Sequence, residues 1–170
     1  MKKLILIILL CWTSNTLQAQ QKRNDTTCPY IKTASGYLMV LRESDNVIAA
    51  IEQLAKVEKI PSAHFTGIGF AAKVEFGFYD FAAKKFNPKT YEKVEMGILT
   101  GSIAWSKADP SIHIHGVATD DQFNAYGGHI LSLTVGTGSM EIYITVDPQK
   151  LERKVEYPLN ANVLQLPCKP

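Results

Sequence analysis

Cysteine is scarce in this chain of 170 residues, which contains only Cys11, Cys28 and Cys168. No two of them form a Cys-x-x-Cys motif, so the usual signature of catalytic thiol and disulfide chemistry is missing. No local motif marks an activated serine or cysteine, and no glycine-rich loop is placed to hold a phosphate group. The glycine-containing segment GTGS, residues 136–139, instead predicts a hairpin turn between two strands.

A surplus of one charge is missing as well. The chain has 18 Lys and Arg against 16 Asp and Glu, and residues 1–19 hold two of the lysines and none of the acids, so the remainder has 16 of each. A formally neutral chain lacks the excess of cations that supplies most non-specific affinity for DNA, and no dense Lys/Arg cluster compensates. We therefore expect no nucleic-acid partner, a hypothesis that salt-dependent retention on DNA would reopen.

Long hydrophobic runs are confined to the N-terminus, where two lysines precede an apolar run over residues 4–12 and a polar stretch that ends in TLQAQ. This pattern predicts a signal peptide over residues 1–19, cleaved near Ala19, and hence a periplasmic or secreted protein. The run has about half of the roughly 20 residues that a spanning helix needs, so we expect no stable membrane anchor. Lipid attachment at Cys11 is the alternative, which Leu10 disfavours because lipoprotein processing needs a small residue there.

Two cysteines remain after the predicted cleavage, Cys28 and Cys168, one near each end of the mature chain. In an oxidising compartment such a pair can form a disulfide bridge, and it can equally persist as two thiols. The sequence leaves both alternatives open.

The rest of the chain predicts one domain in which a helix is followed by strands. Residues 20–29 are polar and predict a flexible N-terminal segment, which leaves a single domain over residues 30–170. Residues 46–60 carry apolar side chains at helical spacing, with Ser44 and Asp45 offering an N-cap and a proline following the helix.

From Ala63 onward, short β-prone runs follow one another, separated by Gly, Pro and Asn and without intervening helices. Sequential strands of this kind predict a mostly antiparallel sheet, and therefore an α+β fold with one main helix packed on the sheet. Residues 155–167 predict a further edge strand, because Pro158 is tolerated only at an edge.

Two histidines lie one residue apart in the segment SIHIHGV, residues 111–117. Side chains alternate between the two faces of a strand, so Ile112 and Ile114 are expected to face the core while His113 and His115 share the opposite face. Imidazoles at this spacing can lean together and bind one metal ion.

A third histidine, His129, follows the stretch ATDDQFNAYGG, in which Asp120 and Asp121 are expected to shape a turn. If the hairpin turns around Gln122, antiparallel pairing sets His115 opposite His129, and all three rings project from one face. The loop length that this register requires is an assumption of the prediction, because the sequence does not determine it.

Three histidines without a fourth protein ligand nearby describe an open metal site, which keeps one coordination position for water or a substrate. Imidazole ligands suit zinc, with copper, nickel and iron as alternatives. The competing interpretation is three exposed or hydrogen-bonded histidines without a metal. The remaining histidine, His64, lies outside the group and is expected to have a structural role.

These motifs also carry a resemblance to a known family. The helix after GYLMVLRESD, the GIG strand, Glu95 six residues before Gly101, the His-x-His strand and Gly-Gly-His stand in the order found in the plants-and-prokaryotes conserved (PPC) domain. That domain of unknown function also occurs beside AT-hooks in plant nuclear proteins, and the resemblance covers residues 35–146. The present chain lacks the Arg-Gly-Arg-Pro hook and the basic region of the plant members, so DNA binding does not follow from the resemblance.

The resemblance implies a curved, mostly antiparallel sheet packed on a helix, assembly as a homotrimer, and zinc bound by His113, His115 and His129. The fold it implies is similar to that of acetolactate decarboxylase, which also holds zinc through histidines. Catalysis is thereby conceivable, by analogy of fold alone.

Two functions fit these observations. The first is an exported, trimeric zinc-binding module with an unknown small-molecule ligand, and the second is a zinc-dependent lyase or hydrolase that acts on a small molecule. An enzyme needs a general acid or base, and Glu95 is the candidate catalytic residue because it holds a motif position one or two strands from the histidines. The alternative reading of Glu95 is a surface carboxylate or a salt-bridge partner, and a pocket containing both Glu95 and the histidines would favour the enzyme.

Overall fold

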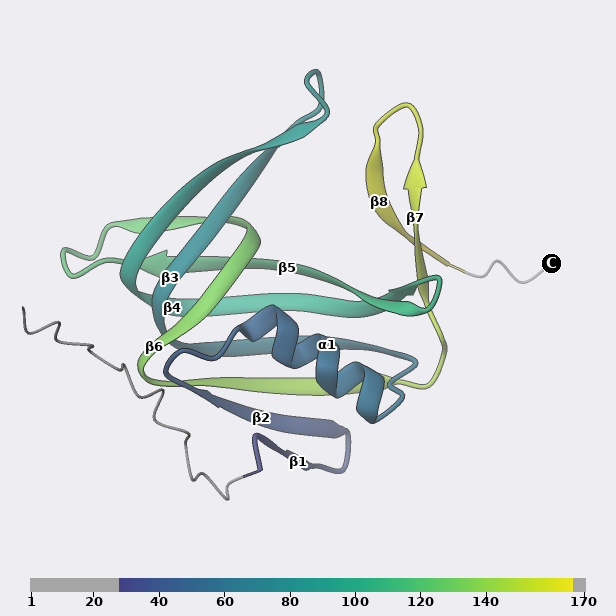
Figure 1. Ribbon diagram of the computed structural model, residues 1–170, viewed down its shortest axis with the longest axis horizontal. Coiled ribbons are helices and arrows are strands. Elements are labelled where there is room, and N and C mark those ends of the chain that lie inside the picture. Colours follow the sequence, from purple (N-terminus) through teal and green to yellow (C-terminus); the bar gives the residue numbers. More distant parts are fainter. Residues whose placement is uncertain (1–27, 167–170) are drawn as a thin grey trace, which may run out of the picture.

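The computed structural model describes residues 28–166, in which one helix packs against a bent, mostly antiparallel sheet, as predicted (Figure 1). The predicted signal peptide, most of the predicted flexible segment and Cys168 lie outside these residues. In chain order the elements are β1 (Tyr30–Lys32), β2 (Gly36–Arg42), α1 (Val47–Val57), β3 (Ser62–Asp80), β4 (Lys85–Ser106), β5 (Asp109–Thr119), β6 (Ala125–Asp147), β7 (Glu152–Glu156) and β8 (Ala161–Gln165).

Three long strands, β3, β4 and β6, form the centre of the sheet, whose strand order is β1-β2-β6-β3-β4-β7-β8. The shorter β5 pairs with both β4 and β6. β3, β4 and β6 bend together, so that their far ends rise away from the half of the sheet that α1 covers (Figure 1). Register shifts within the β3–β6 pairing and at residues 67–69 of β3 accompany this bend, as expected of bulges, which bend and twist the strands that contain them.

The predicted hairpin turn at residues 136–139 is wrong, because β6 continues through this segment as one strand. Gly69 of β3 pairs with Met140, and Ala71 pairs with Val135. Four residues of β6 therefore face the single residue Phe70 of β3. The GTGS segment is a bulge and not a turn, because the stretches before and after it both pair with β3 in the same direction.

The N-cap of helix α1 lies one residue beyond the predicted cap residues, Ser44 and Asp45. Asn46 has an extended backbone, and its side-chain oxygen accepts a hydrogen bond from the Ala49 backbone N–H at 3.0 Å. The carboxylate of Asp45 instead accepts from the backbone N–H of Arg42, and Ser44 has a φ of 73°. Asn46 is therefore the N-cap, since its side chain satisfies a free N–H of the first turn.

The core lies between α1 and the sheet. Most of the predicted apolar stripe of the helix is buried, with Val47, Ile51, Leu54 and Ala55 at 1% exposure or less. The sheet contributes a matching set of buried side chains, which includes Met39, Leu41, Phe65, Leu99, Ile103, Ile114, Ile142 and Ile144.

The C-terminal region forms a hairpin of two strands, where the sequence predicted one edge strand. Pro158 lies in the turn between β7 and β8, so neither strand loses a ladder hydrogen bond to it. Trp105 of β4 holds the start of this hairpin through a parallel bridge to Glu152 and a hydrogen bond from its backbone N–H to the Leu151 carbonyl at 2.9 Å. Within residues 28–166, no helix has the length and apolar character of a membrane span.

Candidate metal centre

The three predicted histidines come together on one face of the β5–β6 pair. His115 is paired with His129 in the register that the turn around Gln122 predicts. On the opposite face of β5, Ile114 is 1% exposed and Ile112 packs against the core, as alternation requires.

The ring nitrogens lie at distances that suit one metal ion. His113 Nε2 is 3.1 Å from His115 Nε2, and His115 Nε2 is 3.4 Å from His129 Nδ1. The ligand atoms of the three residues all lie within 4.8 Å of one another. Two ligands of a tetrahedral zinc at about 2.0–2.1 Å are roughly 3.3–3.4 Å apart, so this cluster can hold a metal with little movement of the side chains.

The electrostatic surroundings keep two of the rings neutral. Burial, followed by the charges of His113, His115 and Arg153, lowers the pKa of His129 to about 4. Burial, followed by the charge of Arg153, also lowers the pKa of His113. A neutral imidazole has a free lone pair, so at pH 7 no proton competes for these two ligand positions.

A turn centred on one carboxylate maintains the register of the histidines. Asp120 Oδ1 accepts hydrogen bonds from the backbone N–H groups of Gln122 (3.0 Å) and Asn124 (2.9 Å), and Asp120 Oδ2 accepts from the Tyr126 hydroxyl at 2.8 Å. The predicted role of Asp120 in shaping the turn is thereby confirmed. The turn is the link between His115 and His129, so Asp120 positions the site without touching it.

The Asp120 turn predicts a pH dependence of stability. Hydrogen bonds to the carboxylate, first from the Asn124 side chain, lower the pKa of Asp120 below its value of 3.8 in an unfolded chain. The ionised group therefore stabilises the fold above that pH, and its contribution is lost as the pH falls through the lower, folded-state pKa. We expect Asp120→Asn to lower the melting temperature at pH 7, and the gap to wild type to shrink towards pH 3.

The matched control is Asp121→Asn, which removes the same charge from an exposed neighbour in the same turn. Thermal unfolding monitored by circular dichroism between pH 7 and pH 3 measures both variants. A gap for Asp120→Asn that stays constant across this range would contradict the role of its ionisation.

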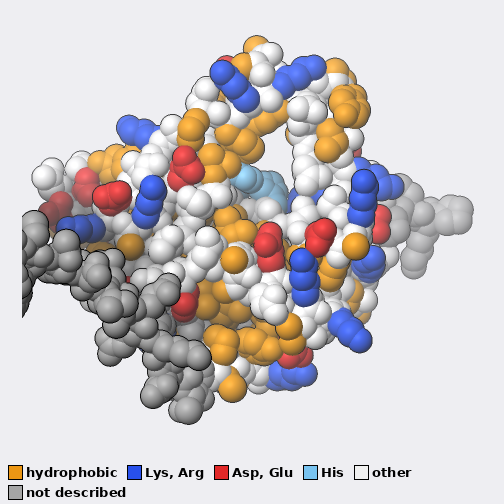
Figure 2. Space-filling view, in the orientation of Figure 1, with side chains coloured by type: hydrophobic (Ala, Val, Ile, Leu, Met, Phe, Trp, Pro, Cys, Tyr) orange, Lys and Arg blue, Asp and Glu red, His pale blue; other side chains and the backbone are white. Residues whose placement is uncertain are grey.

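The histidines line a pocket of about 790 Å³. One wall is the tip of the β3–β4 hairpin and the other is the β7–β8 hairpin, and the Tyr79 hydroxyl joins them by hydrogen bonds to the carbonyls of Leu159 (3.2 Å) and Asn160 (3.0 Å). Figure 2 shows histidine side chains deep in a hollow beneath a rim of hydrophobic side chains. Phe86 stacks on the His129 ring with centroids 4.7 Å apart, so the wall also holds one of the three clustered rings in place.

One residue of this pocket carries no signal in the sequence. Arg153 of β7 lines the pocket and is 6% exposed, and its Nη2 donates a hydrogen bond to Ser102 Oγ at 2.6 Å. Ser102 is the register partner of His113 on the neighbouring strand β4, which places the guanidinium beside the histidine cluster. A lone arginine in a charged C-terminal stretch matches no motif, and only the folding of β7 against β4 brings it here.

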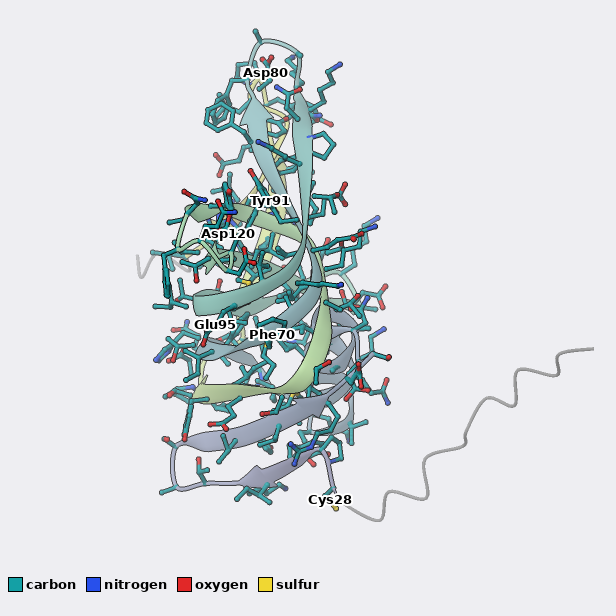
Figure 3. All side chains as sticks on the ribbon, turned by 90° about the vertical axis from the view of Figure 1, so that its left-hand side faces the viewer. Cys28, Phe70, Asp80, Tyr91, Glu95 and Asp120 are labelled. Carbon is teal, nitrogen blue, oxygen red and sulfur yellow. The ribbon has the colours of Figure 1, made fainter. Side chains whose placement is uncertain are left out.

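Glu95 lies away from the histidines. It is in register with Thr119, four residues beyond His115 along β5, which corresponds to roughly 13 Å. Its side chain lines a separate, smaller pocket with Met96 and Glu141. Figure 3 shows Glu95 well below Asp80, which marks the tip of the β3–β4 hairpin that walls the histidine pocket. Within one chain, the structure does not bring together the candidate acid or base and the candidate metal centre.

His64, the fourth histidine, lies outside the cluster, as predicted. Its Nδ1 is 3.7 Å from a carboxylate oxygen of Asp147, and its side chain is 63% exposed.

The bent antiparallel sheet, the single covering helix and the histidine cluster define an α+β domain with a candidate metal centre. Residues 30–147 match the model of the Plants and Prokaryotes Conserved (PCC) domain, the family that the sequence motifs resemble. The chain belongs to this family. Comparison with functionally curated proteins found no significant match.

Several solved structures have a fold similar to that of this chain. A candidate DNA-binding protein from Ralstonia eutropha JMP134 is 60% identical, with a TM-score of 0.80 over 82% of this chain and 96% of its own. A metal-containing protein from Archaeoglobus fulgidus has the same fold at 22% identity, with a TM-score of 0.70 over 82% of this chain and all of its own. Acetolactate decarboxylase from Bacillus subtilis is more distant, with 12% identity and a TM-score of 0.51 over 66% of this chain and 52% of its own.

Proposed function

We propose that this protein is a zinc-binding module of the PPC family, in which His113, His115 and His129 hold the metal and a small molecule binds beside it. The observation that carries the proposal is the spacing of the ring nitrogens: two pairs lie 3.1 and 3.4 Å apart, close to the ligand spacing of one tetrahedral ion, and all three ligand atoms lie within 4.8 Å of one another. The fold shared with a metal-containing archaeal protein supports it. Zinc is the metal proposed because three imidazoles and an open position suit it best.

Hydrogen bonding without a metal is the alternative for these histidines, and the content of metal distinguishes the two. We expect the protein, purified without added metal, to contain close to one zinc per chain by elemental analysis. His129→Ala removes one of three ligands and should leave little metal. His64→Ala is the matched control, because it removes an exposed histidine outside the cluster and should keep the wild-type content. Equal, negligible metal in all three proteins would overturn the proposal.

Trimeric assembly and export are part of the same proposal. The family resemblance favours a trimer, and exposed apolar side chains lie on neighbouring strands of the sheet where a subunit could pack, among them Ile68, Ile98 and Val117. Light scattering should give three times the mass of one chain, and a monomer mass would contradict this. Export rests on the signal-peptide pattern of residues 1–19.

Catalysis by a zinc-dependent lyase or hydrolase is the second candidate function. The observation in its favour is the pocket of about 790 Å³ that opens onto the histidines, a size typical of small-molecule sites. Of the described residues that line this pocket, none is Asp or Glu, so this lining offers no carboxylate as general acid or base. We therefore favour ligand binding over catalysis.

DNA binding, suggested for the relative from Ralstonia eutropha, is not part of the proposal. The 16 basic and 16 acidic residues beyond residue 19 supply no excess of positive charge for phosphates. Salt-dependent retention on a DNA column would reverse this conclusion.

A further inference from the structure

Arg153 is a buried cation with an unused hydrogen-bond donor. The residue is 6% exposed, and burial lowers the pKa of its guanidinium. Within residues 28–166 its one recorded hydrogen bond is to the neutral Ser102 hydroxyl, and its buried Nε has no partner. A buried donor without an acceptor is costly, and a buried charge without a counter-charge is more so. A buried guanidinium of this kind points to a ligand that supplies the missing negative charge.

The pocket around Arg153 is positively charged. Arg153 is the one Lys or Arg among the described residues that line it, and its guanidinium lies beside the histidines through the hydrogen bond to Ser102, the register partner of His113. No acidic side chain occurs among the described residues that line the pocket. A metal bound by the histidines would add further positive charge, so an anionic ligand is favoured with or without the metal.

The remaining walls are apolar and partly aromatic. Phe78, Phe81 and Phe86 line the pocket from the β3–β4 hairpin, and Val163 and Leu164 line it from β8. Such walls favour a ligand with an aromatic or aliphatic body. The described lining offers a single cation, Arg153. Phosphate groups are commonly held by several donors together, so this pocket suits a carboxylate better than a phosphate.

We infer that this pocket binds a small carboxylate with an apolar body, whose carboxylate pairs with the guanidinium of Arg153 beside the three histidines. A planar guanidinium offers a carboxylate two parallel hydrogen bonds, which a hydroxyl or an amine cannot match. The inference rests on the proposed function only in treating the pocket as a ligand site. Arg153 lies outside residues 30–147, the part of the chain that matches the family model, so the family match does not supply this cation.

The test is calorimetric titration with 3-phenylpropanoate, its uncharged analogue 3-phenylpropan-1-ol, and inorganic phosphate. We expect wild type to bind the carboxylate about 10- to 100-fold more tightly than the alcohol, as charge-assisted hydrogen bonds allow, and more tightly than phosphate. Arg153→Gln should remove this preference, and Arg153→Lys should retain part of it. Lys154→Gln is the matched control, because it removes an exposed charge from the next residue of β7 and should bind as wild type.

Metal-free protein separates this inference from the proposed function. After chelation, carboxylate binding that still depends on Arg153 supports the inference even if no zinc is found. Binding that needs zinc and is unchanged in Arg153→Gln would overturn the inference and leave the metal site intact. Preference for phosphate over the carboxylate, or equal binding of the carboxylate and the alcohol by wild type, would also overturn it.

A second measurement does not depend on the folding of a variant. The chain has three arginines, Arg23, Arg42 and Arg153, so few Nε–H resonances appear in a nitrogen-correlated NMR spectrum. The resonance missing from Arg153→Lys, or protected from exchange by burial, identifies Arg153 Nε. We expect this resonance of wild type to shift on adding 3-phenylpropanoate and not on adding the alcohol. No shift with the carboxylate would contradict a contact with Arg153.

Discussion

Replacing Gly101 by alanine is expected to lower the free energy of unfolding by about 3 kcal/mol, because the site has no room for a methyl group. Gly101 lies on β4 between two register partners, Phe65 on β3 and Ile114 on β5. A Cβ at this position would lie 2.5 Å from Phe65 Cζ and would also collide with the backbone carbonyl of His113. Both neighbours are held by the sheet, so the added methyl group must displace β5 or rotate a buried ring.

The displacement reaches the candidate metal centre, since the collision is with the backbone of His113, one of the three clustered histidines. If the proposed site holds zinc, we expect Gly101→Ala to bind less of it, as well as to unfold at a lower urea concentration. Gly97→Ala is the matched control on the same strand: within residues 28–166 and apart from its chain neighbours, an added Cβ there would have only the Val117 carbonyl oxygen within 4 Å, at 3.9 Å. Urea unfolding of both variants measures the difference. Similar midpoints for the two would show that the close packing at Gly101 does not limit stability.

Removal of zinc is expected to destabilise the folded protein strongly, provided that the proposed site exists. A ligand that binds only the native state stabilises it by about 4 kcal/mol at a free concentration one thousand times its dissociation constant. Wild type treated with a chelator should therefore melt at a clearly lower temperature than the same protein with zinc restored. Zinc stabilises the native state because the ligand atoms of His113, His115 and His129 lie within 4.8 Å of one another in the folded chain, and they are not held together in the unfolded chain.

Two histidine variants test whether the stabilising zinc binds at the cluster of His113, His115 and His129. His129→Ala should melt at nearly the same temperature with and without zinc, whereas His64→Ala, which keeps the cluster, should respond as wild type does. Differential scanning calorimetry at a fixed protein concentration compares the three proteins. An equal response of wild type and His129→Ala to zinc would mean that the stabilising metal binds elsewhere.

Local patterns in the sequence predicted the part of the site that local geometry controls. Alternation along SIHIHGV placed His113 and His115 on one face because the side chains of any strand alternate. The turn formers around Asp120 predicted a hairpin there, and the assumption that it turns around Gln122 gave the pairing of His115 with His129 that the structure shows. The buried stripe of α1 followed from helical spacing in the same way.

Local patterns were insufficient where the distant pairing of a strand decides its course. Residues 136–139 have the composition of a hairpin turn, yet β3 pairs with β6 on both sides of them and converts the segment into a bulge. The N-cap moved from Ser44 and Asp45 to Asn46 for a related reason. Val135 of β6 exchanges backbone hydrogen bonds with Ser44 and Asp45, which holds both residues outside the helix.

The sequence by itself determined that His113 and His115 share one face of a strand and that the chain resembles the PPC family; the pairing that adds His129 to them was an assumption, which the structure confirms. Only the tertiary structure decided what surrounds those histidines: the Phe86 ring stacked on His129, the pocket between two hairpins, and the Arg153 guanidinium beside Ser102. It also placed Glu95 at a separate pocket. The physical reason is the range of the interactions, since alternation and turns act between residues close in the chain, whereas Arg153 and Ser102, 51 residues apart, meet only because β7 packs beside β4.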